Sequence, residues 1–117
     1  MAEQRKQTRE KITSFMPIYS MEPKVLLGYL GDLNLLGCMV ISENKLNPSQ
    51  ETTLLIEFPA KIAVPKVTIP AQVAWCKENL DTGYFNIGFT FKALSSDQTQ
   101  ILQTVTDNYQ FRQDMPK

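Results

Sequence analysis

Two arginines near the N-terminus have side chains well suited to binding an anion. Arg5 and Arg9 are four positions apart, so they share one face of a helical turn, or offer two contact points on an extended arm. A guanidinium group donates paired hydrogen bonds to phosphate oxygens and also stacks on aromatic rings. The segment therefore suits a ligand with phosphates and bases, although a basic arm is also common as a plain solvated terminus.

A second group of polar residues follows at Asp32, Asn34 and Gly37. On an extended chain Asp32 and Asn34 point to the same side, while Leu33 and Leu35 point to the other. A carboxylate accepts hydrogen bonds from the N–H groups of a guanine, and a carboxamide both donates and accepts. Gly37 permits a bulge or a close approach. The same residues also suit an Asx turn that leads into a strand.

Conventional enzyme chemistry has little support in the residue types. The chain has no histidine, which removes the Ser-His-Asp and Cys-His arrangements and every histidine-containing metal site. Asp81-Thr82-Gly83 matches a short motif of aspartic proteases, but Asp and Gly are also the residues of a tight hairpin turn. We expect no enzyme, no cofactor and no metal. An aspartic hydrolase is an alternative that requires Asp81 at a dimer axis in a cleft.

The overall charge and the cysteines limit the class of protein. Twelve basic and twelve acidic residues cancel, so we expect no DNA or RNA partner. The N-terminus is charged with no apolar segment behind it, and no apolar run is long enough for a membrane helix. We therefore expect a cytoplasmic protein without membrane insertion. Cys38 and Cys76 have no metal-site spacing and are expected to be reduced thiols in the core.

The candidate site residues must be positioned by the short apolar segments of the chain, which are separated by turn residues. Six or seven strands at near-regular spacing imply a barrel or a sandwich, and of the two we expect a small antiparallel β-barrel. On the last predicted hairpin, Val73 and Trp75 share one phase, which favours a core or cap position for Trp75 over one beside a ligand. The predicted strand segments are residues 12–20, 24–31, 36–42, 52–58, 66–77 and 83–92.

A helix is predicted after the last strand. Ser95 and Gln98 have the spacing of a capping box, and Leu102 and Val105 lie on one helical face with their apolar neighbours. Arg112 is expected near the helix end, where the dipole favours a cation. The chain is thus expected to form one domain over residues 1–117, with a mobile or loosely helical arm at 1–12, a barrel at 13–92 and a helix at 95–112.

Taken together, these motifs resemble the PilZ family, whose pattern is R-x-x-x-R followed by [D/N]-x-S-x-x-G. Residues 5–9 match the first part, and residues 32–37 match the second with Asn34 in the serine position. Residues 72–75 resemble the long strand of the family, and residues 88–91 its Gly-x-x-Phe strand. The capped helix resembles its C-terminal helix.

The resemblance implies a receptor for cyclic di-GMP, a bacterial second messenger. Carried over by position, Arg5 and Arg9 clamp the phosphates and stack on the guanines, while Asp32, Asn34 and Gly37 line the guanine edge. Ligand binding would then order the arm and signal to a separate effector protein or through a homodimer. The alternative is a PilZ-fold adaptor, for instance in pilus or motility machinery, that does not bind the nucleotide. Asn34 favours this alternative, and the two arginines disfavour it.

Overall fold

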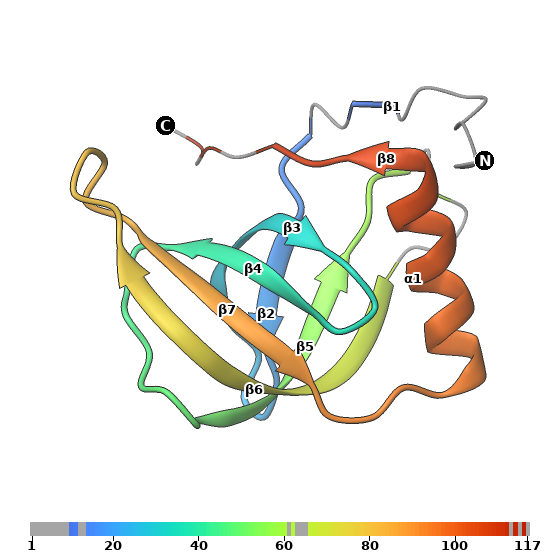
Figure 1. Cartoon of the computed structure of the whole chain (residues 1–117), viewed down its shortest axis with the longest axis horizontal. Coiled ribbons are helices and arrows are strands. Elements are labelled where there is room, and N and C mark those ends of the chain that lie inside the picture. The colour runs from blue at the N-terminus through green and yellow to red at the C-terminus, as the bar shows by residue number, and fades with distance from the viewer. Residues whose placement is uncertain are drawn as a thin grey trace, which may run out of the picture.

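The computed structural model describes residues 10–11, 14–60, 62, 66–112, 114 and 116, which form strands and one helix (Figure 1). The elements in chain order are β1 (Glu10–Lys11), β2 (Pro17–Ser20), β3 (Val25–Leu33), β4 (Gly37–Ser42), β5 (Glu51–Glu57), β6 (Lys66–Glu78), β7 (Phe85–Phe91), α1 (Ser96–Asn108) and β8 (Tyr109–Gln110).

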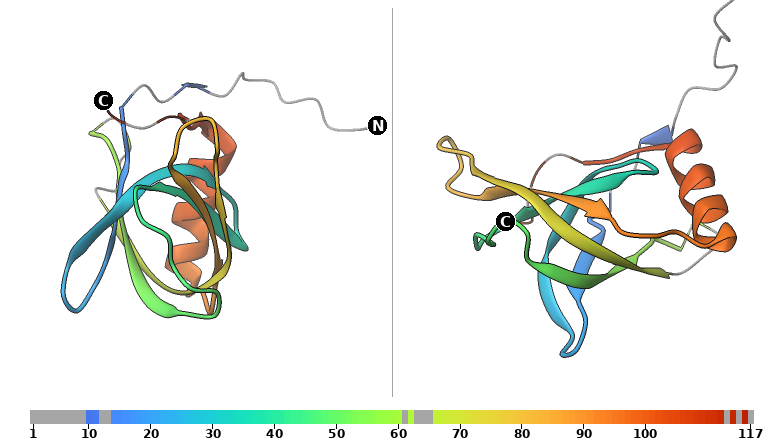
Figure 2. Two further views of the ribbon diagram at one scale, coloured as in Figure 1. Left: turned by 90° about the vertical axis from the view of Figure 1, so that its left-hand side faces the viewer. Right: turned by 60° about the horizontal axis from the view of Figure 1, so that its bottom comes forward.

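Six strands form a closed antiparallel barrel in the order β2-β3-β4-β7-β6-β5, which confirms the predicted fold class. Pairing of β2 with β5 closes the barrel, and the turned views of Figure 2 show the sheet curling round on itself. Strand alternation fills the interior, as on β6, where Val67, Ile69, Ala71 and Val73 are all buried. The apolar segments thus form one core inside the barrel.

The strand register shifts at three places in the barrel: between β2 and β3, between β3 and β4, and between β6 and β7. Two of these shifts are β-bulges next to Asp32 and Trp75. On β3, Leu30 pairs with Val40 but Asp32 pairs with Met39, so Gly31 is an extra residue. On β6 the register shifts in the same way between Val73 and Trp75. The second bulge turns Trp75 outward, with 46% of its surface exposed, so the prediction that it shares the inward phase of Val73 is wrong. Cys76 faces the core instead, partly buried, whereas Cys38 is buried as predicted.

Helix α1 begins at the predicted capping box. The Ser95 hydroxyl accepts from the Gln98 N–H at 3.1 Å, and the Gln98 side chain accepts from the Ser95 N–H at 2.7 Å. Gln98 also donates to the Thr68 carbonyl of β6 at 2.7 Å, which ties the start of the helix to the barrel. Leu102 and Val105 then complete the core. In the described part of the chain no helix is long and apolar enough to cross a membrane.

The end of α1 differs from the prediction. The helix stops at Asn108, not at 112, because Tyr109 takes an extended conformation (φ −133°, ψ 149°) and pairs with Glu10 in a parallel β1–β8 ladder. This pairing also corrects the prediction of a mobile or loosely helical arm at residues 10–11, which form β1. Arg112 consequently lies beyond the helix rather than in its last turn.

The β6–β7 hairpin contains the predicted turn. The Gly83 N–H donates to the Asn79 carbonyl at 2.8 Å, and Gly83 has a positive φ of 80°, which glycine adopts without strain. The Asn79 side chain accepts from the Asp81 N–H at 2.9 Å. Asp81 is exposed at the tip of this hairpin, and it acts as a turn residue here.

Candidate functional site

Asp32 and Asn34 lie side by side at the end of β3. Both are exposed, whereas Leu33 is buried and Leu35 is half-buried, as the predicted alternation requires. The bulge at Gly31 produces this arrangement, because without the extra residue Asp32 would continue the inward phase of Leu30. The two polar side chains therefore face the same side of the strand.

Asn34 closes the turn between β3 and β4. Its side-chain oxygen accepts from the Leu36 N–H at 2.8 Å and from the Gly37 N–H at 3.0 Å. Its own backbone N–H donates to the Gly37 carbonyl at 3.0 Å. The oxygen of the carboxamide is thus occupied by the backbone, and the NH₂ group is the part of the side chain that can meet a ligand.

The carboxylate of Asp32 is only partly used by the protein. One oxygen accepts from the Leu33 N–H at 2.9 Å, which leaves the second oxygen as an acceptor. Beneath it, burial and then the negative charge of Asp32 raise the pKa of the Cys38 thiol to about 12. Cys38 therefore stays protonated near neutral pH and does not act as a nucleophile.

A row of residues crosses four neighbouring strands from Asp32 to Trp75. Asp32 pairs with Met39, Met39 with Gly88, and Gly88 with Trp75. This row forms the floor and walls of a groove of about 250 Å³, which we call the Trp75 groove. The lining includes Asp32, Asn34, Gly37, Met39, Trp75 and Gly88.

Two glycines make the close contacts of this groove possible. A Cβ on Gly88 would lie 2.2 Å from the Trp75 Nε1, so the indole rests directly over the glycine. A Cβ on Gly37 would lie 1.9 Å from the Phe89 carbonyl oxygen, which confirms the predicted close approach at Gly37. Side chains at either position would displace the wall or the floor of the groove.

A second hollow, of about 560 Å³, lies next to the first. Residues 31–35 form one side of it, and Thr106, Tyr109, Gln110 and Phe111 form the other, so we call it the α1 hollow. Asp32 and Asn34 line both hollows. The two polar residues thus stand on the ridge between the groove and the end of α1.

The described residues that line the two hollows carry negative charge and no positive charge. Asp32 is the charged residue among the described residues that line them, and neither lining includes a described lysine or arginine. Arg5 and Arg9, the predicted phosphate-binding residues, lie outside the described residues. The described site therefore offers an acceptor, an amide donor and an aromatic wall.

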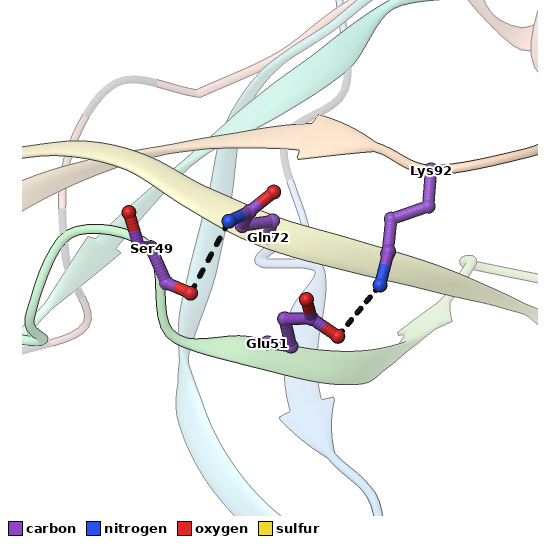
Figure 3. Close-up of polar contacts among 4 residues, drawn as sticks. All are labelled: Ser49, Glu51, Gln72 and Lys92. Carbon is purple, nitrogen blue, oxygen red and sulfur yellow. Dashed lines mark hydrogen bonds and ion pairs between the residues drawn. The ribbon is translucent and has the colours of Figure 1, made fainter.

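A further hollow, of about 440 Å³, lies beside β5, where the polar groups pair with each other. In its lining the Lys92 ammonium lies 2.6 Å from a Glu51 carboxylate oxygen, and just outside the lining the Gln72 side chain donates to the Ser49 carbonyl at 3.3 Å (Figure 3). The one cation of this lining is thus neutralised by its neighbour. Among the described residues, no group of three Cys, Asp or Glu is placed to hold a metal ion.

The sequence reasoning did not assign Met39 or Gly88 to the site, and it favoured a core or cap position for Trp75 over one beside a ligand. A glycine inside a strand signals a close approach, so Gly88 was the available clue to a large side chain packed over it. The alternation of side chains along β6 does not reveal its bulge before Trp75. This one-residue shift moves every following side chain to the other face, so the direction predicted for Trp75 was reversed.

Comparisons with known proteins agree with the fold. A model of the PilZ domain matches residues 3–107. The fold is similar to a solved structure of the Bacillus subtilis inhibitor of motility, MotI/DgrA, with a TM-score of 0.66 and 13% identity over 87% of this chain and 49% of that chain. This chain spans about half the length of that protein, and the likeness shows a shared fold.

No curated protein was found that matches the chain. PilZ domains are receptor and adaptor modules connected with cyclic di-GMP, and they are not enzymes. The family model covers nearly all of the sequence, from the N-terminal segment to the last turn of α1. The chain belongs to the PilZ domain family.

Proposed function

We propose that this protein is a cyclic di-GMP receptor that places one guanine of the ligand in the Trp75 groove and signals to a separate protein. The observation that carries the proposal is the convergence of Asp32, Asn34 and Trp75 on one groove. They come from different strands and loops, and two bulges are needed to turn Asp32 and Trp75 outward.

The chemistry of the groove suits a guanine. The available oxygen of Asp32 can accept from guanine N–H groups, and the NH₂ group of Asn34 can donate to a ring nitrogen or carbonyl oxygen. The exposed indole of Trp75 offers a flat apolar surface, and stacking of a base on an aromatic ring contributes about 1–3 kcal/mol. Hydrogen bonds thus select the base, and the indole adds affinity.

The phosphates require a different part of the chain. A ligand with two negative charges gains nothing from a groove whose charged residue is Asp32, so cations must come from elsewhere. Arg5 and Arg9 supply them under this proposal, and Lys6 adds a third positive charge nearby. The arm would fold over the bound ligand, and this ordering would create or hide a surface for an effector protein or a second copy of the chain.

The test is titration calorimetry with cyclic di-GMP. Loss of two charge-assisted contacts in an Arg5→Ala, Arg9→Ala variant should weaken binding by about a hundredfold or more. Affinity for the intact protein should also fall as salt rises, because phosphate contacts are screened. Lys24→Ala is the matched control, since it removes a cation at the β2–β3 turn, away from the groove.

Two outcomes would contradict the proposal. Unchanged affinity in the double variant would remove the arginine clamp, and no binding by the intact protein would remove the receptor function. A PilZ-fold adaptor without nucleotide is the second candidate. Asn34 favours it, because its oxygen is committed to the turn and it stands in the family's serine position. A stable protein complex in pull-downs, together with no heat from cyclic di-GMP, would support the adaptor.

A further inference from the structure

The segments just before the barrel and just after α1 run side by side. Figure 1 shows β1 and β8 next to each other above the barrel. We call residues 10–11 and 14–16 the arm root, and residues 109–112 and 114 the C-terminal strap. Glu10 pairs with Tyr109 and Lys11 with Gln110, so the first contact between the two segments is a parallel ladder.

A second contact joins them further along. The Arg112 guanidinium lies over the Phe15 ring, 3.9 Å from its centroid, which is the geometry of a cation–π interaction. Asp114 holds the guanidinium through hydrogen bonds of 2.9 Å to Nε and 2.8 Å to Nη2. Phe15 in turn packs edge-on against Tyr29 of β3 at 5.7 Å. The arm root is thus fixed between the strap and the barrel.

The strap is also held against α1 and the core, beside the proposed ligand site. The Tyr109 N–H donates to the Val105 carbonyl of α1, and the side chains of Tyr109 and Phe111 pack against the core. Tyr109, Gln110 and Phe111 also line the α1 hollow together with Asp32 and Asn34. One short segment therefore contacts the helix, the arm root and the hollow beside the proposed guanine site.

We propose that the C-terminal strap is a positioning element for ligand binding, with Arg112 and Phe15 as its positioning residues. Glu10, which follows Arg9 in the sequence, is paired to Tyr109 of the strap, and Tyr109 lines the α1 hollow. Fixing the root in advance lowers the conformational entropy that binding must remove, because fewer residues are ordered when the arm folds. This inference rests on the proposed receptor function.

Affinity measurements on strap variants test the inference. Arg112→Ala and Phe15→Leu should each weaken cyclic di-GMP binding by about three- to fivefold, which is the range for one exposed cation–π contact. Phe15→Tyr keeps the aromatic ring, so it should bind cyclic di-GMP as tightly as the intact protein. Lys24→Ala is the matched control, because Lys24 lies over the Tyr19 ring at 4.5 Å and pairs with Glu57 at 3.6 Å without touching the strap.

A double-mutant cycle separates positioning from general destabilisation. If the strap acts through the arm, Arg112→Ala should cause no further loss of affinity once Arg5 and Arg9 are alanine. A loss of the same size in both backgrounds would overturn the inference while leaving the receptor function intact.

Hydrogen exchange supplies a measurement that needs no ligand. Amides of the arm root, residues 10–11 and 14–16, should exchange several-fold faster in Arg112→Ala than in the intact protein, with the barrel strands unchanged, because local opening follows local contacts. Equal exchange in the two proteins would overturn the inference. If the intact protein binds no cyclic di-GMP, the receptor function is wrong, and so is the role of the strap in ligand binding. Hydrogen exchange then decides whether the strap fixes the arm root.

Discussion

Asn34 is the residue at which the chain departs from the pattern of its family, and its contacts give a physical account of the difference. Its oxygen closes the β3–β4 turn by accepting from the Leu36 and Gly37 N–H groups. A serine hydroxyl can also accept from the backbone in such a turn, so both residue types suit the fold. Both residue types can still donate outward, a serine through its hydroxyl proton and Asn34 through the NH₂ group on a longer side chain.

Substitutions at Asn34 should separate the turn from the ligand contact. Asn34→Asp keeps the turn acceptor but replaces the donor with a second carboxylate beside Asp32, and should weaken cyclic di-GMP binding by about tenfold or more. Asn34→Ser should bind and melt like the intact protein. Asn34→Ala should lower the free energy of unfolding by about 1 kcal/mol, because two backbone donors lose their acceptor.

Calorimetry and thermal denaturation measure the two effects on the same samples. If Asn34→Asp binds cyclic di-GMP as tightly as the intact protein, Asn34 does not donate to the ligand, and the proposed orientation of the guanine is wrong.

At the scale of elements, the bulges separate what sequence could predict from what it could not. Simple alternation predicted that Asp32 and Asn34 share one side of the chain, whereas the bulge at Gly31 decides that this side faces outward. The direction of Trp75 was not predictable, because the extra residue before it, Ala74, has no special backbone requirement and gives no signal. The helix start was visible in its capping box, whereas the helix end was set by pairing with Glu10, a residue far away in sequence.

Gly88→Ala tests the contact that holds the indole in place. A methyl group there would meet the Trp75 ring at 2.2 Å, so the ring must move and the groove must change shape. The overpacked variant should lose about 1–3 kcal/mol of unfolding free energy and should also lose ligand affinity. Trp75 is the single tryptophan of the chain, so its fluorescence reports the movement directly.

Gly83→Ala is the control for this substitution. It should also destabilise the protein, because Gly83 has a φ of 80°, but no atom lies within 4 Å of the added methyl group. Tryptophan emission and affinity for cyclic di-GMP should therefore match the intact protein. If both variants changed emission equally, the position of the indole would not depend on Gly88.

For the whole molecule, the strand count and the single core were predictable, but the connections between the two ends of the chain were not. Regular apolar segments and turn residues indicated an antiparallel barrel, which the structure confirms. The parallel β1–β8 pair joins two segments of two residues each, too short to show any periodicity. Closure of the barrel by β2 and β5 also depends on tertiary packing rather than on a local pattern.

Barrel closure has a measurable consequence for stability at high pH. Burial in the closed core, with the charge of Asp32 as a second cause, raises the pKa of Cys38 from 9.0 to about 12. Between these values the unfolded chain loses the thiol proton and the folded barrel keeps it, so stability must fall as pH rises. The contribution is constant below pH 9 and then declines by at most about 1.4 kcal/mol per pH unit.

Urea denaturation between pH 7 and pH 10.5 measures this slope. Lysines and tyrosines also titrate in this range, so the informative quantity is the difference between the intact protein and Cys38→Ala, in which the thiol is absent. Their unfolding free energies should differ by a constant up to about pH 9 and converge above it, because only the intact protein loses the thiol contribution. Cys76→Ala, at a partly buried position on the same barrel, should instead keep the alkaline decline of the intact protein. Parallel curves for the intact protein and Cys38→Ala would show that water reaches Cys38 and that the barrel opens beneath Asp32, in which case the floor of the Trp75 groove is not rigid.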